Sequence, residues 1–328
     1  MRAWTIAGQT GPQDLKLIEA EKPKISGNDV LVRMTAPGVV PFDGAIINDE
    51  NEPEFPPASF PLQPGNQGAG IVEDPGSSSF SRGDRVMFGA FVYGFMRPGA
   101  WAEYVAVDAD HLFKIPASIP DGAAAQAVVA YPTAWFALRD AGFAAGKTVL
   151  ATGISGSVGN AAYQLARGKG AAKVFGTVGS AEKAERARAL GYENIIDLSQ
   201  ESMPEAVRRL NGGDGVDIVI DAVGGQVIAQ AIKCLGRYGK AIVLGFAAGR
   251  ASTITLADLI LVRGSIQGYG AYTSTPDEWR EAWADCTALA DAGKLNVLFD
   301  RAYPFEQAPE ALRYMSRERP FGAVALTL

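Results

Sequence analysis

The sequence predicts an α/β protein in which a β-rich N-terminal region is joined to a doubly wound domain with a parallel sheet. Short extended runs, cut by glycine and proline, fill the chain up to about residue 120. Buried β-branched runs then alternate with helical segments as far as about residue 268. Since single hydrophobic cores rarely exceed roughly 250–300 residues, a chain of 328 residues also favours two domains.

The composition excludes several classes of protein. Hydrophobic residues make up 48% of the chain, so a disordered protein is not expected. The net charge of -6, without a basic block, argues against nucleic acid or an anionic membrane as a partner. Two cysteines, Cys234 and Cys286, are too few for a disulfide framework, so we expect a cytoplasmic protein. The longest apolar stretch, 122–138, is interrupted by Gln126 and Pro132, which predicts a buried helix and turn and no membrane span.

The extended runs of the N-terminal region are expected to be strands of a small β-rich domain. They span residues 30–34, 70–73, 85–88 and 102–107. A proline-rich segment, 48–64, lies between the first two runs and predicts a long loop with little local structure.

The second half of the chain is expected to build the parallel sheet and the helices that cover it. Strands are predicted at 148–151, 173–178, 194–197, 216–220 and 240–244, and helices at 158–169, 181–190, 204–210 and 227–235. Continuous apolar strands between helices are typical of a parallel sheet covered on both faces. Beyond Gly268 we expect helices at 276–292 and 308–315 and short extended runs at 296–299 and 324–327.

The most specific motif is the glycine-rich turn Gly153–Gly159, which follows a predicted strand and opens a predicted helix. Glycine lets the backbone approach a pyrophosphate, and the helix N-terminus supplies N–H groups and positive charge. The turn therefore predicts a dinucleotide site. Its expected contacts are Ser155, Gly156, Ser157 and Val158. The alternative is a turn that needs glycine only for packing.

The end of the next strand indicates which dinucleotide is bound. An NAD site usually has Asp or Glu about 20 residues beyond the glycines, to bind the ribose 2′-hydroxyl. Residues 177–183 carry no carboxylate at the strand end, where Gly179 and Ser180 stand, with Lys183 close by. A hydroxyl and a lysine suit a 2′-phosphate, so we predict NADPH. The alternative is that Lys183 is an ordinary solvated helix residue.

The order and spacing of these motifs resemble the zinc-free quinone oxidoreductase branch of the medium-chain dehydrogenase/reductase superfamily. The segments that carry the resemblance are 38–43, 64–70, 83–86, 99–105, 153–159, 177–183 and 221–225. The resemblance implies a GroES-like catalytic domain from residues 1–122 and 268–328 and a Rossmann domain from residues 123–267. It also implies an active site between the domains and a homodimer, which edge-strand pairing near residues 265–268 would form.

Further cofactor contacts follow from the same resemblance. Relatives use the loop that here reads Gly245, Phe246 and Ala247 to hold nicotinamide, and this loop follows the end of a predicted strand, where doubly wound sheets bind ligands. Val223 belongs to one of the resembling segments, and Gly268 with Tyr269 is a weaker candidate for the nicotinamide side.

The sequence predicts that no functional metal is bound. Zinc-dependent relatives carry His-Glu where this chain has Asn66 and Gln67. Zinc needs three or four closely placed ligands, whereas His111 is a single histidine and both cysteines lie far downstream. Alcohol oxidation by a zinc mechanism is therefore not expected.

Catalytic and substrate-binding residues are also transferred from the resemblance. Asp43 keeps a position of the family and is expected either to hold a catalytic hydrogen-bond network or to cap a helix. Thr133 matches a threonine placed beside nicotinamide, and Tyr131 either faces the substrate as a proton donor or is a packed aromatic residue. Val40 stands where many relatives have Asn, and Gly44 and Ala45 stand where a tyrosine is common, so the pocket is expected to be less polar than usual. The expected substrate contacts are Val40, Phe42 and Tyr131.

These observations predict an enzyme, an NADPH-dependent reductase that transfers hydride to a small, largely apolar quinone or α,β-unsaturated carbonyl without a metal. One alternative is an enoyl-thioester reductase, although no basic patch for a CoA-like tail is evident. The other is a catalytically silent NADPH-binding protein, because polar groups usual in the family are missing near Val40.

Overall fold

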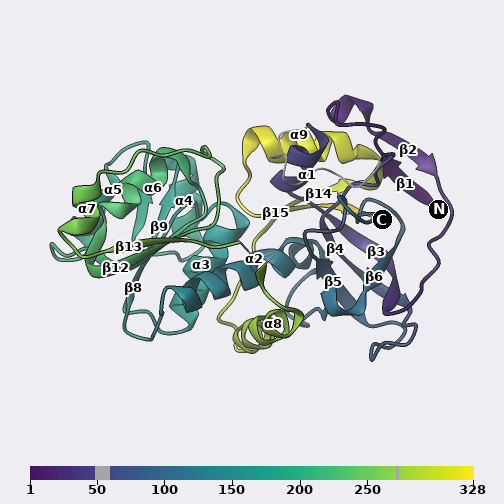
Figure 1. Ribbon diagram of the computed structural model, residues 1–328, viewed down its shortest axis with the longest axis horizontal. Helices are drawn as coiled ribbons and strands as arrows, with labels where there is room; N and C mark the ends of the chain where they lie inside the picture. The colour runs from purple at the N-terminus through teal and green to yellow at the C-terminus, as the bar shows by residue number, and fades with distance from the viewer. Residues whose placement is uncertain (49–59, 271–272) are drawn as a thin grey trace. The chain divides into compact units, whose positions relative to one another are not determined.

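The computed structural model describes residues 1–48, 60–270 and 273–328 (Figure 1). Contacts divide the chain into two compact units: unit 1 is Met1–Val129, Thr275–Trp283 and Val297–Leu328, and unit 2 is Ala130–Ser274 and Ala284–Asn296. The domain boundaries inferred from the sequence stay a prediction. Most of the proline-rich segment expected to be a loop, residues 49–59, lies outside the described residues.

Unit 1 is mainly a β structure. Its strands are β1 (Arg2–Thr5), β2 (Lys16–Glu19), β3 (Asp29–Val39), β4 (Gln67–Asp74), β5 (Arg85–Gly89), β6 (Tyr104–Asp108), β7 (Leu112–Lys114), β14 (Phe299–Pro304) and β15 (Ala323–Thr327). Its complete helices are α1 (Pro41–Ile47) and α9 (Ala308–Glu318), with 3₁₀ turns at Pro12–Asp14, Ala109–His111 and Phe305–Gln307.

The main sheet of unit 1 combines strands from both ends of the chain. The strand order is β14-β15-β3-β4-β5-β7, and β6 also pairs with β3, while β1 and β2 form a separate two-stranded sheet. β15 pairs antiparallel with the end of β3, with Val324 opposite Val39. The C-terminal segment is therefore part of the N-terminal fold.

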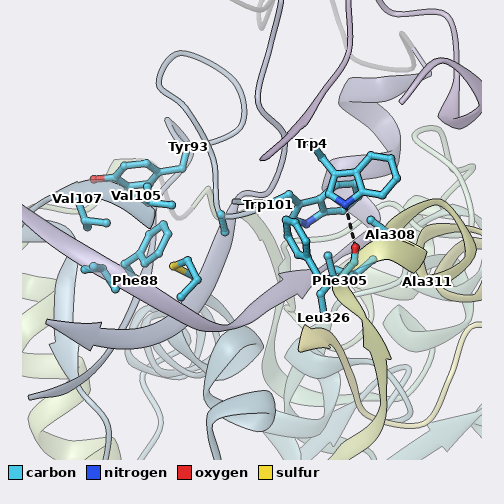
Figure 2. Packing of buried hydrophobic residues seen from close by; sticks show 14 of the residues in the cluster. Trp4, Phe88, Tyr93, Trp101, Val105, Val107, Phe305, Ala308, Ala311 and Leu326 are labelled. Carbon is cyan, nitrogen blue, oxygen red and sulfur yellow. Dashed lines mark hydrogen bonds between the residues drawn. The ribbon is translucent and has the colours of Figure 1, made fainter. Parts of the chain in front are cut away.

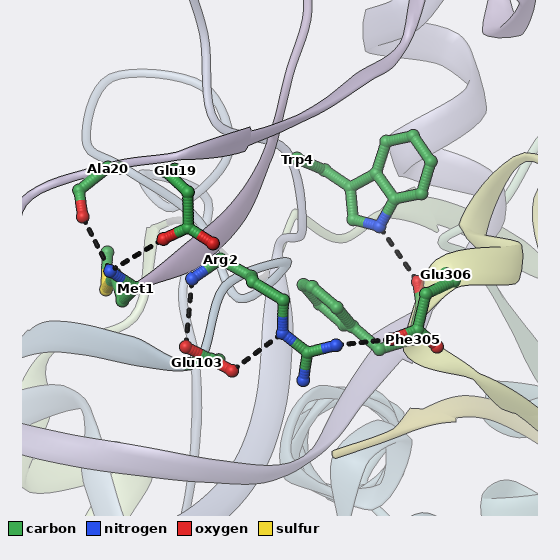
Figure 3. A network of polar contacts seen from close by, with 8 residues as sticks. All are labelled: Met1, Arg2, Trp4, Glu19, Ala20, Glu103, Phe305 and Glu306. Atoms are coloured by element: carbon green, nitrogen blue, oxygen red, sulfur yellow. Dashed lines mark hydrogen bonds and ion pairs between the residues drawn. The ribbon is translucent and has the colours of Figure 1, made fainter.

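Aromatic residues from distant segments fill the core of unit 1. Figure 2 shows Trp4 and Trp101 packed near Phe305 and Leu326. The Trp4 Nε1–H donates to the Phe305 carbonyl at 2.8 Å, so the indole is buried without losing its hydrogen bond. At the edge of this core, Arg2 donates to Glu103 at 2.8 Å and pairs with Glu306 (Figure 3). These contacts attach the first strand to the C-terminal segment.

Unit 2 is a doubly wound α/β domain, as predicted. Its strands are β8 (Thr148–Ala151), β9 (Lys173–Val178), β10 (Ile195–Asp197), β11 (Val216–Asp221), β12 (Leu235–Val243) and β13 (Ser265–Gly268), and its complete helices are α3 (Ser157–Gly168), α4 (Ala181–Ala189), α5 (Met203–Leu210), α6 (Gly225–Ile232) and α7 (Leu256–Ile260). The sheet is parallel in the order β10-β9-β8-β11-β12-β13. In Figure 1, α5 and α6 lie on one side of this sheet and α3 on the other. Side chains of α5 and α6 pack on β8 and β11 in one apolar cluster.

The unit boundaries fall within two helices, α2 (Asp121–Asp140) and α8 (Pro276–Asp291), so each helix contributes residues to both units. The expected turn within α2 is wrong, because the helix continues through Pro132. Proline has no N–H to give to the carbonyl four residues earlier, which belongs to Val128. The Trp283 Nε1–H donates to that carbonyl at 3.1 Å instead. A tertiary hydrogen bond thus satisfies the carbonyl oxygen that proline leaves unpaired.

Other differences from the sequence prediction concern the short helix α7, which was not predicted, and short or exposed strands. β1, β2 and β7 were not predicted, and an edge strand at 265–268, which is β13, was expected only from the family resemblance. β2 and β13 are exposed along their whole length, so they show no burial pattern to recognise. The run expected at 296–299 is wrong, because β14 begins only at Phe299. Within the ranges that the structure describes, no helix combines the length and the apolarity needed to cross a membrane.

Candidate cofactor and substrate sites

All predicted dinucleotide contacts of unit 2 follow the carboxyl ends of its parallel strands, so the topology brings them to one edge of the sheet. Ser155, Gly156, Ser157 and Val158 lie between β8 and α3 or at the start of α3, and Gly179, Ser180 and Lys183 lie between β9 and α4 or at its start. Val223 follows β11, and Gly245, Phe246 and Ala247 follow β12. Gly268 is the last residue of β13, and Tyr269 follows it.

The glycine turn is held in place by side chains of the neighbouring elements. Gly153 adopts a φ of 63°, which favours glycine. Its N–H donates to Thr177 Oγ1 of β9 at 3.0 Å. The Asn160 Nδ2–H of α3 donates to the Ile154 carbonyl at 3.0 Å. The backbone of the turn is therefore preorganised by both the strand and the helix that flank it.

The last two glycines of the turn have different physical roles. A Cβ on Gly159 would lie 2.3 Å from the Thr152 carbonyl oxygen and 2.6 Å from that of Gly153, so this glycine permits close packing of α3 on β8. A Cβ on Gly156 would meet nothing closer than 3.5 Å. No side chain caps α3 at Gly156. The fold itself does not require glycine at position 156, whereas a pyrophosphate bound at the helix N-terminus would require it.

The end of β9 is open in the way that a 2′-phosphate needs. Gly179 is exposed, and a Cβ there would have no neighbour within 4 Å. Ser180 caps α4, where its Oγ accepts the Lys183 N–H at 3.3 Å. The Ser180 hydroxyl proton remains able to donate to an anion. Lys183 lies in the first turn of α4, where a cation opposes the helix dipole, so a bound anion would offset this unfavourable position.

A buried carboxylate shapes the loop after β11. Asp221 accepts from the Thr152 hydroxyl at 2.5 Å and from the Gly224 N–H at 2.8 Å. Burial raises the pKa of Asp221 above its usual value. The Ala248 N–H donates to the Val223 carbonyl at 2.8 Å, which places the loop after β12 against the loop after β11. Phe246, in that second loop, is 57% exposed.

Tyr131 and Thr133 both carry buried hydroxyls with no hydrogen-bond partner among the described residues. Burial and the nearby Tyr192 and Cys286 side chains raise the pKa of Tyr131 well above its usual value. These neighbours belong to the interior of unit 2, which favours the packed-aromatic alternative for Tyr131. The Thr133 hydroxyl, which no described residue bonds, remains a candidate for a hydrogen bond to a ligand.

Replacement of Tyr131 by Phe separates the two alternatives. We expect Tyr131→Phe to raise the free energy of unfolding by about 1–3 kcal/mol, because it removes a buried hydroxyl that has no partner. Urea unfolding measures this change. A tenfold decrease in kcat with an enone, together with unchanged stability, would instead support the proton-donor role predicted from the sequence.

Asp43 organises the candidate substrate site of unit 1. Its carboxylate is 3% exposed and accepts the Val40 N–H at 2.9 Å and the Asn66 N–H at 2.8 Å. Asp43 therefore caps α1 and also connects α1 to the start of β4. These contacts agree with the helix-capping role, which was one of the two alternatives. Phe42 packs edge-on against Phe91, with ring centroids 5.5 Å apart.

Burial raises the pKa of Asp43 from 3.8 to about 7, although the two backbone N–H donors lower it. The folded protein thus holds a proton that the unfolded chain has lost between these pH values, so the stabilisation is complete below about pH 4 and disappears as the pH rises through about 7. We expect the unfolding free energy of the wild type, relative to Asp43→Asn, to fall by roughly 2–3 kcal/mol from pH 5 to pH 8. Urea titrations at several pH values measure it, and parallel profiles would contradict it.

One candidate residue was missed as a functional group. Gln67 entered the sequence argument only because it replaces a glutamate of zinc-dependent relatives, yet its Oε1 is buried without a partner among the described residues. Its neighbour Asn66 is engaged differently, since its Nδ2 donates to the Ala90 carbonyl at 2.9 Å. The sequence shows that residue 67 has an amide side chain, but it does not show that this side chain is buried. The signal was therefore only partly available in the sequence.

A β-rich unit, a parallel-sheet unit and a glycine turn open at Gly156 define a two-domain protein of the dinucleotide-binding α/β class. Residues 26–117 match the family described as alcohol dehydrogenase GroES-like domain, and residues 157–288 match the family described as zinc-binding dehydrogenase. These matches and the parallel sheet confirm the predicted fold class.

Individual relatives indicate the family more narrowly than the two domain matches do. The chain is 30% identical to human quinone oxidoreductase over 316 residues, covering 95% of this chain and 92% of that protein. It is 30% identical to quinone oxidoreductase 1 of Escherichia coli over 312 residues, covering 92% and 91%. The solved structure of Escherichia coli quinone oxidoreductase complexed with NADPH superposes with a TM-score of 0.86, 26% identity and full coverage of both chains.

The chain belongs to the quinone oxidoreductase-like branch of the medium-chain dehydrogenase/reductase superfamily, as predicted, and it is an oxidoreductase. Although one matched description names zinc, no group of three His, Cys, Asp or Glu side chains is placed to hold a metal in the described part of the chain. The absence of a functional metal stays a prediction.

Proposed function

We propose that this oxidoreductase is an NADPH-dependent reductase of small quinones or α,β-unsaturated carbonyl compounds and that it acts without a metal. The observation that carries the proposal is the open end of β9, where Gly179 and Ser180 replace an acidic residue and Lys183 follows in the first turn of α4. NADPH, when bound, supplies the hydride. The quinone oxidoreductase relatives support the acceptor class, and the NADPH complex of the Escherichia coli protein supports the cofactor.

The residues of unit 2 are assigned to parts of the cofactor. Backbone N–H groups of the glycine turn and of the start of α3 bind the pyrophosphate. Ser180 donates a hydrogen bond to the 2′-phosphate and Lys183 supplies a positive charge. The loop of Gly245, Phe246 and Ala247, the end of β13 and the Thr133 hydroxyl serve the nicotinamide side; no described residue bonds that hydroxyl.

The residues of unit 1 are assigned to the substrate. Val40 is a buried apolar residue and Phe42 a partly buried one, and we assign them to an apolar wall of the site, which suits a small acceptor. Asp43 positions Val40 through the hydrogen bond that its carboxylate accepts from the Val40 N–H. With no metal to polarise the acceptor, reduction depends on an acceptor that is already electron-poor and on its orientation.

The cofactor preference is tested at Lys183. An ionic contact to a partly exposed 2′-phosphate contributes about 1–3 kcal/mol, so Lys183→Ala is expected to weaken NADPH binding by roughly 5- to 150-fold. NADH lacks this phosphate and should bind almost unchanged. Fluorescence titration with both cofactors measures the difference, and equal losses would assign Lys183 a structural role.

The reaction is tested by NADPH consumption over a panel of quinones, enones and acyl-thioester enones. We expect turnover of quinones or simple enones and little turnover of thioesters. Turnover of thioesters alone would favour an enoyl-thioester reductase. Tight NADPH binding without turnover of any acceptor would favour a catalytically silent binding protein.

We also propose a homodimer formed through the edge of the unit 2 sheet. Among the described strands β13 pairs only with β12, so its outer backbone groups are unpaired. Four apolar side chains are exposed on α7, at its end and on β13, namely those of Leu256, Ile260, Leu261 and Ile266. Leu261 is 82% exposed. Light scattering on the purified protein measures the mass, and a monomer would contradict the proposal. The cytoplasmic location stays a prediction.

A further inference from the structure

Gln67 has an unusual environment for a buried amide. It begins β4 and is only 5% exposed, yet its Oε1 has no hydrogen-bond partner in the described residues. A buried acceptor without a partner is unfavourable and rare in native proteins. Such a group is expected where a ligand completes the hydrogen bond.

The backbone around Gln67 is held in place by its neighbours. Gln67 pairs with Gly89 of β5, and the Asp43 carboxylate holds the preceding Asn66 N–H at 2.8 Å. A Cβ on Gly89 would lie 3.0 Å from the Gln67 Cβ, and one on Gly38 would lie 3.4 Å from its Cγ. Glycine at position 89 therefore leaves room for the start of this side chain, whereas the distance from Gly38 is ordinary contact.

A second glutamine of unit 1 provides the contrast. Gln126 is 3% exposed, and its Nε2 donates to the Val39 carbonyl at 2.8 Å and to the Val324 carbonyl at 3.1 Å. It joins α2 to β3 and β15, which is a structural role. Two glutamines of similar burial in one unit therefore differ in whether the described residues satisfy their amide groups.

We propose that Gln67 determines substrate specificity by accepting, at Oε1, a hydrogen bond from a hydroxyl or N–H group of the acceptor molecule. This inference rests on the proposed reduction and narrows its substrates to acceptors that carry a donor besides the reducible group. In this proposal Val40 makes an apolar contact with the acceptor and Gln67 makes a polar one. Asp43 positions both residues, because its carboxylate accepts the backbone N–H groups of Val40 and of Asn66, which precedes Gln67.

The first measurement is the stability of two matched variants, Gln67→Met and Gln126→Met. Methionine has nearly the shape of glutamine without its hydrogen-bonding groups. Gln67→Met is expected to unfold at the same or a higher urea concentration than the wild type, whereas Gln126→Met is expected to unfold at a lower one. An equal decrease for both variants would overturn the inference, because it would mean that Gln67 is bonded within the protein.

The second measurement compares 4-hydroxycyclopent-2-en-1-one with its O-methyl ether, which lacks the donor. We expect the wild type to favour the hydroxy compound by about tenfold or more in kcat/KM, because the ether leaves Oε1 unpartnered. In Gln67→Met the ratio should fall to about one through KM, with NADPH affinity unchanged. Gln126→Met should keep the wild-type ratio.

A third measurement distinguishes failure of this inference from failure of the proposed function. Calorimetry with the saturated ketones, 3-hydroxycyclopentan-1-one and its O-methyl ether, reports binding without turnover. A preference for the hydroxy ketone that Gln67→Met abolishes supports the inference even if no acceptor is reduced. Turnover with a substrate ratio that Gln67→Met leaves unchanged would overturn the inference and leave the reductase standing.

Discussion

Replacing Gly159 by Ala is expected to lower the free energy of unfolding by about 3 kcal/mol or more, or to prevent folding. The added Cβ would lie 2.3 Å and 2.6 Å from the carbonyl oxygens of Thr152 and Gly153. Neither oxygen moves easily, since Thr152 follows β8 and the Gly153 N–H is bound by Thr177. α3 therefore has to move away from the sheet, which breaks the packing of its buried face.

The matched control is Gly168→Ala, at the other end of the same helix. A Cβ there would be 3.5 Å from Leu289 Cδ2 and 3.5 Å from Lys294 Cβ, which is ordinary contact distance. Alanine is favoured over glycine in a helix by up to about 1 kcal/mol, so this variant should be as stable as the wild type or slightly more stable. Urea unfolding followed by circular dichroism measures both variants. A wild-type midpoint for Gly159→Ala would show that α3 accommodates the methyl group.

Replacing Gly156 by Ala is expected to leave the fold intact and to weaken NADPH binding by about 100-fold or more. The protein has room for the methyl group, because its nearest neighbour would be the Gly153 oxygen at 3.5 Å. The methyl group would project at the uncapped start of α3, where the pyrophosphate is proposed to lie. Loss of one or two hydrogen bonds to a charged group, at about 1.5–3 kcal/mol each, accounts for the magnitude.

This second variant tests binding separately from folding. Its urea midpoint should match that of the wild type, and NADPH and NADH should be weakened alike, because both carry the pyrophosphate. That pattern differs from the selective loss expected of Lys183→Ala. An unchanged NADPH affinity would mean that the glycine turn serves packing only, which is the alternative weighed from the sequence.

Local sequence patterns were sufficient for the elements of unit 2 that are buried and regular. The strands predicted at 148–151 and 173–178 match β8 and β9 residue for residue, and the helix predicted at 158–169 matches α3 within one residue at each end. Buried strands of a parallel sheet consist of continuous apolar runs, and a helix between them has a 3.6-residue period. Both signals lie within a few residues and need no distant partner.

Elements whose stability comes from distant segments were not predictable in this way. β2 and β13 are exposed throughout, so their sequence shows no buried face, and only pairing with β1 and β12 makes them strands. α2 continues through Pro132 because Trp283, some 150 residues later, donates to the Val128 carbonyl. Local propensity alone indicates a break at this proline.

By itself, the sequence determined the family, the fold class and the edge of the sheet at which the dinucleotide contacts gather, because these depend on motif order and on hydrophobic periodicity. The tertiary structure alone decided which polar groups are left for ligands. Asp43 has both carboxylate oxygens bonded to backbone N–H groups, whereas the buried oxygens of Thr133 and Gln67 have no partner in the described chain. Hydrogen-bond satisfaction depends on which distant atoms come within about 3 Å, and the linear sequence does not specify those distances.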